Sequence, residues 1–141
     1  MGCYHYFRTS SSVESQFENF KTLINIQAQD LIPLVDLEEN DRFSSVEYNE
    51  RVKRFLVLLE DYIGKKPILY STQRFYNMYL KNRYKEYYWI IARYSKKTPV
   101  LLDNNEITIW QFTDKAKLKG ISKNVDLNLL HKGHKFEWLL L

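Results

Sequence analysis

The chain has 141 residues, enough for one domain with a hydrophobic core, and its 45% hydrophobic and 27% charged content is ordinary for a globular protein. Lys and Arg outnumber Asp and Glu by 21 to 17, a net charge of +4, which suits an anionic partner but identifies none. The single cysteine, Cys3, excludes an internal disulfide and a cysteine-rich metal site, and no apolar run approaches the roughly 18–20 residues of a membrane span.

The first half of the chain predicts strands that alternate with helices. Residues 3–7 are rich in aromatic side chains and predict a strand. Residues 13–24 carry apolar side chains at helical spacing, whereas residues 31–38 form an apolar run too short for a helix and predict a second strand. Residues 44–63 begin with a capping-box pattern and carry the strongest apolar stripe of the chain. Residues 67–71 predict the third strand.

The second half of the chain predicts one more helix and then strands. A helix is expected from a cap at Ser71 or Thr72 to about Tyr79, and residues 113–123 predict a basic loop. Three further strands are expected at residues 87–94, 107–112 and 124–128. Alternating strands and helices indicate parallel strands joined by helical crossovers. Without a linker or an internal repeat, residues 1–141 are expected to form a single domain.

Two acids follow the second predicted strand. Asp36 and Glu38 are two positions apart, so on a strand their side chains point to the same face, with Cα atoms roughly 6–7 Å apart. Such a pair either carries out chemistry or serves the structure, since turns and helix starts also favour acids. The spacing alone leaves both interpretations open.

Six stretches of the sequence carry motifs in a common order. They are residues 2–8 (G-x-Y-H-F-x-R), 35–38 (D-x-E), 66–71 (K-P-x-x-Y-[ST]), 89–94 (W-[IV]-A-x-Y, with one extra residue), 110–112 (W-Q-[YF]) and 120–128 (G-[IV]-x-G-x-V-D-x-N, with Lys123 for a glycine). Together they resemble the glycoside hydrolase family 25 lysozymes, the muramidases of the cellosyl and phage-endolysin type. The resemblance covers nearly the whole chain.

The resemblance implies an α/β fold, an irregular TIM-like (β/α) barrel whose active site lies at the carboxyl ends of its strands. No stretch matches the family's first two strand–helix units, and 141 residues are fewer than the roughly 200–250 that a complete barrel needs. We therefore expect an incomplete barrel, an N-terminally truncated form of the domain. The closing residues 137–141 have no family counterpart and are expected to pack beneath the barrel.

The resemblance also implies a reaction, the cleavage of the β-1,4 bond between N-acetylmuramic acid and N-acetylglucosamine in peptidoglycan. Glu38 is then the general acid and later the base, which requires a pKa above that of a free glutamate. Asp36 is its ionised neighbour and orients the 2-acetamido group of the substrate, which assists retention of configuration. Asp126 is expected as a supporting acid at the barrel mouth.

Aromatic side chains suit a sugar cleft because their faces stack on pyranose rings. Tyr6 and Tyr70 lie near strand exits and are the favoured substrate contacts, together with Gln111. Tyr4 shares the face of Tyr6 but lies deeper, so packing in the core is an equal alternative. Trp89 completes the candidate contacts, although large aromatic side chains more often fill the core.

No cofactor and no metal are expected, since His131 and His134 lack further ligands nearby. His5 is expected to be a hydrogen-bonded structural histidine. A nucleic-acid interface is disfavoured because no recognised motif accompanies the tyrosines and basic side chains of residues 76–93. The remaining alternative is a wall-binding remnant without turnover, with its open edges free to pair in a homodimer. The intact protein is expected outside the cell or in the envelope, although no signal peptide is visible.

Overall fold

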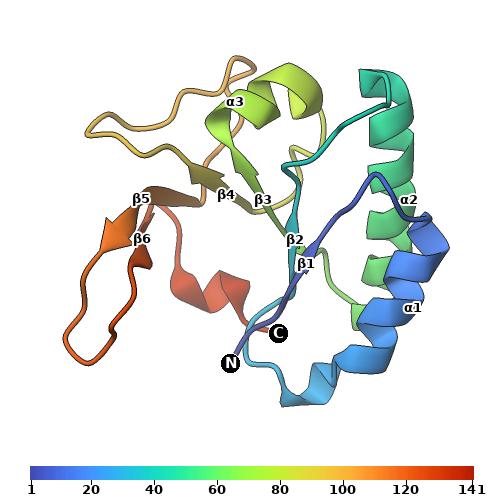
Figure 1. Ribbon diagram of the computed structural model, residues 1–141, viewed down its shortest axis with the longest axis horizontal. Helices are drawn as coiled ribbons and strands as arrows, with labels where there is room; N and C mark the ends of the chain where they lie inside the picture. Colours follow the sequence, from blue (N-terminus) through green and yellow to red (C-terminus); the bar gives the residue numbers. More distant parts are fainter.

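The computed structural model describes all 141 residues as an α/β fold around one sheet (Figure 1). The six strands lie in sequential order: β1 (Tyr4–Tyr6), β2 (Leu34–Asp36), β3 (Ile68–Thr72), β4 (Trp89–Ala92), β5 (Ile109–Ala116) and β6 (Val125–Leu130). β1 to β5 are parallel, and β6 returns antiparallel to β5. The expected mostly parallel sheet is confirmed, and it does not close, because β1 and β6 each keep a free edge.

The helices that connect the strands cover one face of the sheet (Figure 1). α1 (Val13–Leu23) joins β1 to β2, followed by the short 3-10 helix η1 (Ile26–Ala28), and α2 (Ser45–Ile63) joins β2 to β3. The third helix consists of the single turn α3 (Gln73–Phe75) and a π-helical turn η2 (Tyr76–Leu80). The last element is the 3-10 helix η3 (Phe136–Leu139). None of these helices combines the length and apolarity that a membrane crossing needs.

The main core lies between the sheet and α2. Alternate residues of the strands and of the segments that follow them point to this side, and six of them are buried in one cluster with the apolar stripe of α2: Phe7, Val35, Leu37, Leu69, Trp89 and Ile91. The burial of each such side chain contributes about 1.5–3 kcal/mol. His5 points to the same side, where its Nε2 bonds Gln16 Oε1 at 3.0 Å and its ring stacks on Phe55. The structural role predicted for His5 is confirmed.

The opposite face of the sheet is covered only near the amino ends of the strands. Leu34, Ile68, Ile90 and Ile109 pack there against Leu139 of η3, and together with neighbouring apolar side chains they line a hollow of about 310 Å³. An antiparallel bridge between Leu31 and Leu140 holds the C-terminal segment in place. The expected packing of the last residues beneath the strands is confirmed. Beyond this hollow, toward the carboxyl ends of the strands, no helix covers this face.

The ends of α2 follow the predicted pattern. The Ser44 hydroxyl accepts from the Glu47 backbone N–H, the Glu47 carboxylate accepts from the Ser44 backbone, and both contacts of the capping box are present. Gly64 ends the helix in the left-handed region at φ 73°, which side chains with a Cβ rarely adopt. Local sequence therefore fixes both ends of the longest helix.

The last hairpin differs from the predicted loop. β5 continues to Ala116 and β6 to Leu130, so that part of the stretch expected as loop at residues 113–123 is paired strand. Register shifts between Gln111 and Thr113 and between Thr113 and Ala116 interrupt the ladder. These irregularities let the strands twist and keep pairing although the sequence does not alternate cleanly.

The buried Ser71 hydroxyl fixes the chain just before Glu38, because it donates to the Leu37 carbonyl at 2.7 Å. Ser71→Ala would leave that buried carbonyl without this donor, and we expect the free energy of unfolding to fall by about 1–3 kcal/mol in urea titrations. Ser95→Ala is the matched control, since the Ser95 hydroxyl is exposed and its bond to Lys97 spans two residues. Equal urea midpoints for both variants would contradict the role of Ser71.

Candidate active site

Asp36 and Glu38 share one side of the chain at the carboxyl end of β2. Asp36 is the last residue of the strand, and the intervening Leu37 is fully buried against the helices, as is Val35. The two acids therefore point to the free face, where both are half-buried. Their charges interact, because Glu38 contributes to the raised pKa of Asp36. The common face expected from the spacing is present, and the roles of the acids stay predictions.

Hydrogen bonds from neighbouring elements hold this segment in place. The Leu37 N–H donates to the Tyr70 carbonyl at 2.9 Å and continues the β2–β3 pairing beyond the strand. Glu39 Oε1 accepts from both the backbone N–H and the hydroxyl of Thr9, each at 3.1 Å, which ties the exits of β1 and β2 together. Glu38 is thus held between a backbone contact of Leu37 and a side-chain contact of Glu39.

Two predicted tyrosines flank the acids. The sheet register pairs Tyr6 with Asp36 and Asp36 with Tyr70, so the three side chains lie side by side on adjacent strands. Burial raises the pKa of Tyr6, and the negative charges of Glu39, Asp36 and Glu38 raise it further. Burial followed by the charge of Glu38 raises the pKa of Tyr70. Both phenols are therefore neutral hydrogen-bonding groups beside the acid pair.

Gln111, on β5, lies within hydrogen-bond distance of Tyr70. Its Oε1 accepts the Tyr70 hydroxyl at 2.8 Å and the Tyr94 hydroxyl at 3.0 Å. Gln111 is only 7% exposed, whereas Tyr70 is half-buried and Tyr94 is 53% exposed, so these bonds lie at the partly buried edge of the site. The side chains of Tyr70, Gln111 and Tyr94 form a cluster that we call the tyrosine–glutamine network. Sequence reasoning missed Tyr94, although it is the tyrosine that closes the motif of residues 89–94.

Within the acid pair, Asp36 is the residue whose pKa is raised. Burial, followed by the negative charge of Glu38, raises the pKa of Asp36 from an ordinary 3.8 to about 7. Its Oδ1 is buried and receives no hydrogen bond, so nothing offsets the loss of hydration. The sequence predicts Asp36 as the ionised neighbour of Glu38. Burial and the negative charge of Glu38 disfavour that ionised form in the free protein, and the role of Asp36 stays a prediction.

This shift predicts a pH dependence of stability. The folded protein binds a proton at Asp36 more tightly than the unfolded chain, so the free energy of unfolding should fall as the pH rises from about 4 to about 7. Asp36→Asn should flatten that slope and stabilise the protein at pH 7.5, as measured by urea titrations at several pH values. Asp61→Asn is the control, since Asp61 is exposed on α2. A slope unchanged by Asp36→Asn would contradict the prediction.

Asp126 lies at the edge of this group. It is exposed on β6, and its charge, together with those of Asp114 and Glu38, adds to the burial that raises the pKa of Tyr94. The charge of Asp126 is thus felt at Tyr94, and it is not among the causes of the raised pKa of Asp36. Its contribution as a supporting acid stays a prediction.

Two predicted substrate contacts lie elsewhere. Trp89 is fully buried on the helix side, where Nε1 donates to the Tyr84 carbonyl at 3.0 Å and the ring packs edge-on to Tyr76. The candidate role of Trp89 in substrate binding is therefore corrected, since its side chain serves the core. Tyr4 is 69% exposed at the amino end of β1, next to the apolar hollow. It belongs neither to the core nor to the acid pair.

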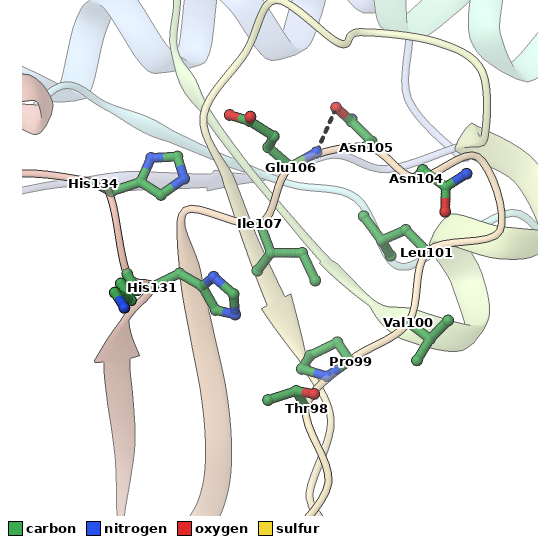
Figure 2. Close-up of a pocket in the computed structure, with 11 residues that line it drawn as sticks. Thr98, Pro99, Val100, Leu101, Asn104, Asn105, Glu106, Ile107, His131 and His134 are labelled. Atoms are coloured by element: carbon green, nitrogen blue, oxygen red, sulfur yellow. Dashed lines mark hydrogen bonds between the residues drawn. The ribbon is translucent and has the colours of Figure 1, made fainter.

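The two histidines of the C-terminal part line a different groove, shown in Figure 2. This groove of about 420 Å³ lies between residues 98–107 and the segment that contains His131 and His134, near the start of β5. His134 and Glu106 point toward each other across it (Figure 2). No group of three His, Cys, Asp or Glu side chains is placed to hold a metal ion. The groove is lined by neither Asp36 nor Glu38.

Comparisons with known proteins agree with this arrangement. A family model described as "Glycosyl hydrolases family 25" matches residues 1–121. The chain is similar to the uncharacterized protein YegX of Escherichia coli (strain K12), with 34% identity over 132 residues, which are 92% of this chain and 47% of YegX. The chain thus spans about half the length of this curated relative.

Solved structures show the same fold. A family 25 glycosyl hydrolase from Bacillus anthracis superposes with a TM-score of 0.82 at 31% identity, covering 96% of this chain and 65% of that one. A bacterial lysozyme from Streptomyces coelicolor superposes with a TM-score of 0.79 at 19% identity, covering 98% of this chain and 69% of the lysozyme. The open sheet therefore corresponds to part of a larger barrel.

Proposed function

The chain belongs to glycosyl hydrolase family 25, and on that premise we propose that it acts on peptidoglycan. The proposed reaction is hydrolysis of the β-1,4 bond between N-acetylmuramic acid and N-acetylglucosamine. The observation that carries the proposal is the placement of Asp36 and Glu38 on one side of the β2 exit, flanked by Tyr6 and Tyr70. Carboxyl ends of parallel strands are where barrels of this kind place their chemistry.

In this proposal Glu38 performs the proton transfers. Its carboxyl gives a proton to the glycosidic oxygen while the bond from that oxygen to the sugar C1 breaks. The 2-acetamido oxygen of the same sugar bonds to C1 from the opposite face, and the later attack of water inverts C1 again, so that the configuration is retained overall. Glu38, now ionised, takes a proton from the water that attacks C1 and opens the acetamido ring. Each proton that Glu38 gives is thereby regained.

Asp36 is suited to hold the acetamido group during this step. Its buried Oδ1 lacks a donor in the free protein, and the N–H of an acetamido group would supply one. A hydrogen bond to the ionised carboxylate would also lower the pKa of Asp36 when substrate binds. Asp36, whose pKa is raised in the free protein, would then become the ionised neighbour that the mechanism uses. Substrate binding and ionisation of Asp36 are coupled in this proposal.

The surroundings of the acids suit a polymer. The phenols of Tyr6 and Tyr70 offer ring faces and hydroxyls to a sugar chain. We propose a site of action outside the cell or in the envelope, where a wall substrate lies. Pairing of two copies through the β1 edge stays a prediction.

A second candidate function is glycan binding without turnover, because the ring faces and hydroxyls of Tyr6 and Tyr70 can bind a sugar chain whether or not the acids react. One experiment separates the two. Purified protein is incubated with purified peptidoglycan, and new reducing ends are measured in the supernatant alongside the protein that sediments with the wall. Release of reducing ends supports the hydrolase, and sedimentation without release supports the binder. The absence of both would overturn the proposal.

A further inference from the structure

The hairpin of β5 and β6 continues past the carboxyl end of the neighbouring strand. The register pairs Ala92, the last residue of β4, with Gln111, whereas β5 runs on to Ala116 and from there on pairs only with β6. At about 3.3 Å per residue, this continuation carries the hairpin roughly 15 Å beyond the end of β4. Figure 1 shows it in orange, extending away from the rest of the molecule. We call residues 112–127 the lysine hairpin.

The tip of the lysine hairpin carries the whole positive excess of the chain. Residues 115–123 contain no acid and four lysines, which are Lys115, Lys117, Lys119 and Lys123. These are four of the 21 Lys and Arg residues, and the remaining 17 balance the 17 Asp and Glu. All four lysines are exposed, and the ion pairs of the structure involve other residues. Their charge is therefore available to an anionic partner.

A tight turn gives this tip a defined shape. The Ile121 N–H donates to the Leu118 carbonyl at 3.1 Å, and Gly120 between them has a φ of 91°. A hydrogen-bonded turn with a positive φ at its third residue requires glycine there, as in a type II turn. The turn contains Lys119, and a further lysine lies within two residues on either side. Three of the four lysines are thus concentrated at one projecting turn.

The acids of the proposed function lie at the same end of the sheet. β2, β3, β4 and β5 are parallel neighbours in that order, so Glu38 and the lysine hairpin are three strand spacings apart, about 14 Å along the sheet. At this separation the lysines do not reach the bond beside Glu38, but they can reach groups attached to neighbouring sugars of the same polymer. In peptidoglycan, each muramic acid carries a short peptide with free carboxylates.

We infer that the lysine hairpin binds the carboxylates of the peptides of peptidoglycan and so holds the glycan strand across the acids. The inference rests on the proposed function and names the part of the substrate that this surface recognises. An ammonium group has three N–H donors for a carboxylate, although one exposed pair of this kind contributes little. Four lysines on one projection act together on a polymer that repeats its carboxylates along its length. The hairpin therefore sets affinity, whereas the acids carry out the reaction.

The first test measures sedimentation with peptidoglycan that hydrofluoric acid has freed of phosphate-bearing polymers. A fourfold variant should bind about tenfold more weakly, about twofold for each lysine, and its affinity should depend less on salt: Lys115→Gln, Lys117→Gln, Lys119→Gln and Lys123→Gln. The matched control makes the same change in net charge at four exposed lysines elsewhere and should bind as wild type does: Lys53→Gln, Lys81→Gln, Lys85→Gln and Lys135→Gln. Equal affinities of the two variants would overturn the inference.

Two further wall preparations identify the anion. On peptidoglycan whose carboxylates have been converted to amides, wild type and the hairpin variant should bind equally. A difference between the two proteins that persists on the amidated wall would overturn the inference. So would a difference that appears only on walls that keep their phosphate-bearing polymers, because the partner would then be a phosphate polymer.

Turnover separates this inference from the proposed function. In the reducing-end assay, the hairpin variant should raise the apparent KM about tenfold and keep kcat within about twofold of wild type. An unchanged KM would overturn the inference even if the protein is a hydrolase. A wild-type protein that binds through the lysine hairpin but releases no reducing ends would refute the proposed hydrolysis and leave the hairpin as the wall-binding surface.

Discussion

Replacing Glu38 by glutamine is expected to lower the release of reducing ends from peptidoglycan by about 10²–10⁴-fold, the usual loss when a general acid is removed. The amide keeps the size of the side chain and its place after the buried Leu37, but it has no acidic proton for the leaving oxygen. Sedimentation of the variant with the wall should stay at the wild-type level. The pair of measurements is a reducing-end assay and a wall pull-down on the same sample.

Glu39→Gln is the matched control for this experiment. Glu39 is the next residue and also carries a carboxyl, but its Oε1 accepts two hydrogen bonds from Thr9, and an amide oxygen can accept them as well. We expect its activity to stay within about threefold of wild type, because the amide oxygen keeps both hydrogen bonds that tie the exits of β1 and β2 together. A Glu38→Gln protein as active as the Glu39→Gln protein would remove Glu38 from the mechanism.

Replacing Trp89 by alanine is expected to lower the free energy of unfolding by about 3–5 kcal/mol. Trp89 is fully buried, its ring packs 4.9 Å from that of Tyr76, and its Nε1 bonds the Tyr84 carbonyl. The truncation leaves a large cavity and removes the hydrogen bond to that carbonyl. Urea titration at fixed pH measures the loss, and much of the domain's total stability would be gone.

Trp138→Ala tests whether this effect belongs to burial and not to tryptophan as such. Trp138 is 44% exposed on η3 and stacks on Tyr88 at 6.4 Å, so its loss should change stability by about 1 kcal/mol or less. Trp89→Phe should restore part of the stability and keep binding to peptidoglycan. If Trp89→Ala instead kept its urea midpoint and lost the glycan, Trp89 would be a substrate contact after all.

The features that could be predicted from the sequence are those that local chemistry decides. The span and both ends of α2 follow from Ser44, Glu47 and Gly64, which act within one turn of the helix. The common face of Asp36 and Glu38 follows from the two-residue period of an extended chain. Neither feature depends on what the rest of the molecule contributes, so no partner had to be known.

The features that could not be predicted depend on neighbours that are distant in sequence. The pKa of Asp36 reflects a missing hydrogen-bond donor and the charge of Glu38 at a partly buried position, which spacing does not reveal. The role of Tyr94 appears only when β4 and β5 bring its hydroxyl to Gln111. The side of the sheet on which Trp89 lies depends on the register of β4, since a shift of one residue reverses every side chain.

Both chain ends meet beneath the sheet, at the pole away from the acids (Figure 1). The carbonyl of Met1 accepts the backbone N–H of Asp30 at 2.7 Å, and the N–H of Leu141 donates to the carbonyl of Asp30 at 3.0 Å. Either end of the chain can therefore carry a fluorophore, an affinity tag or a tether to a solid support without blocking access to Glu38. When the protein is coupled to beads in this way, Asp36 and Glu38 would face outward, toward peptidoglycan in suspension.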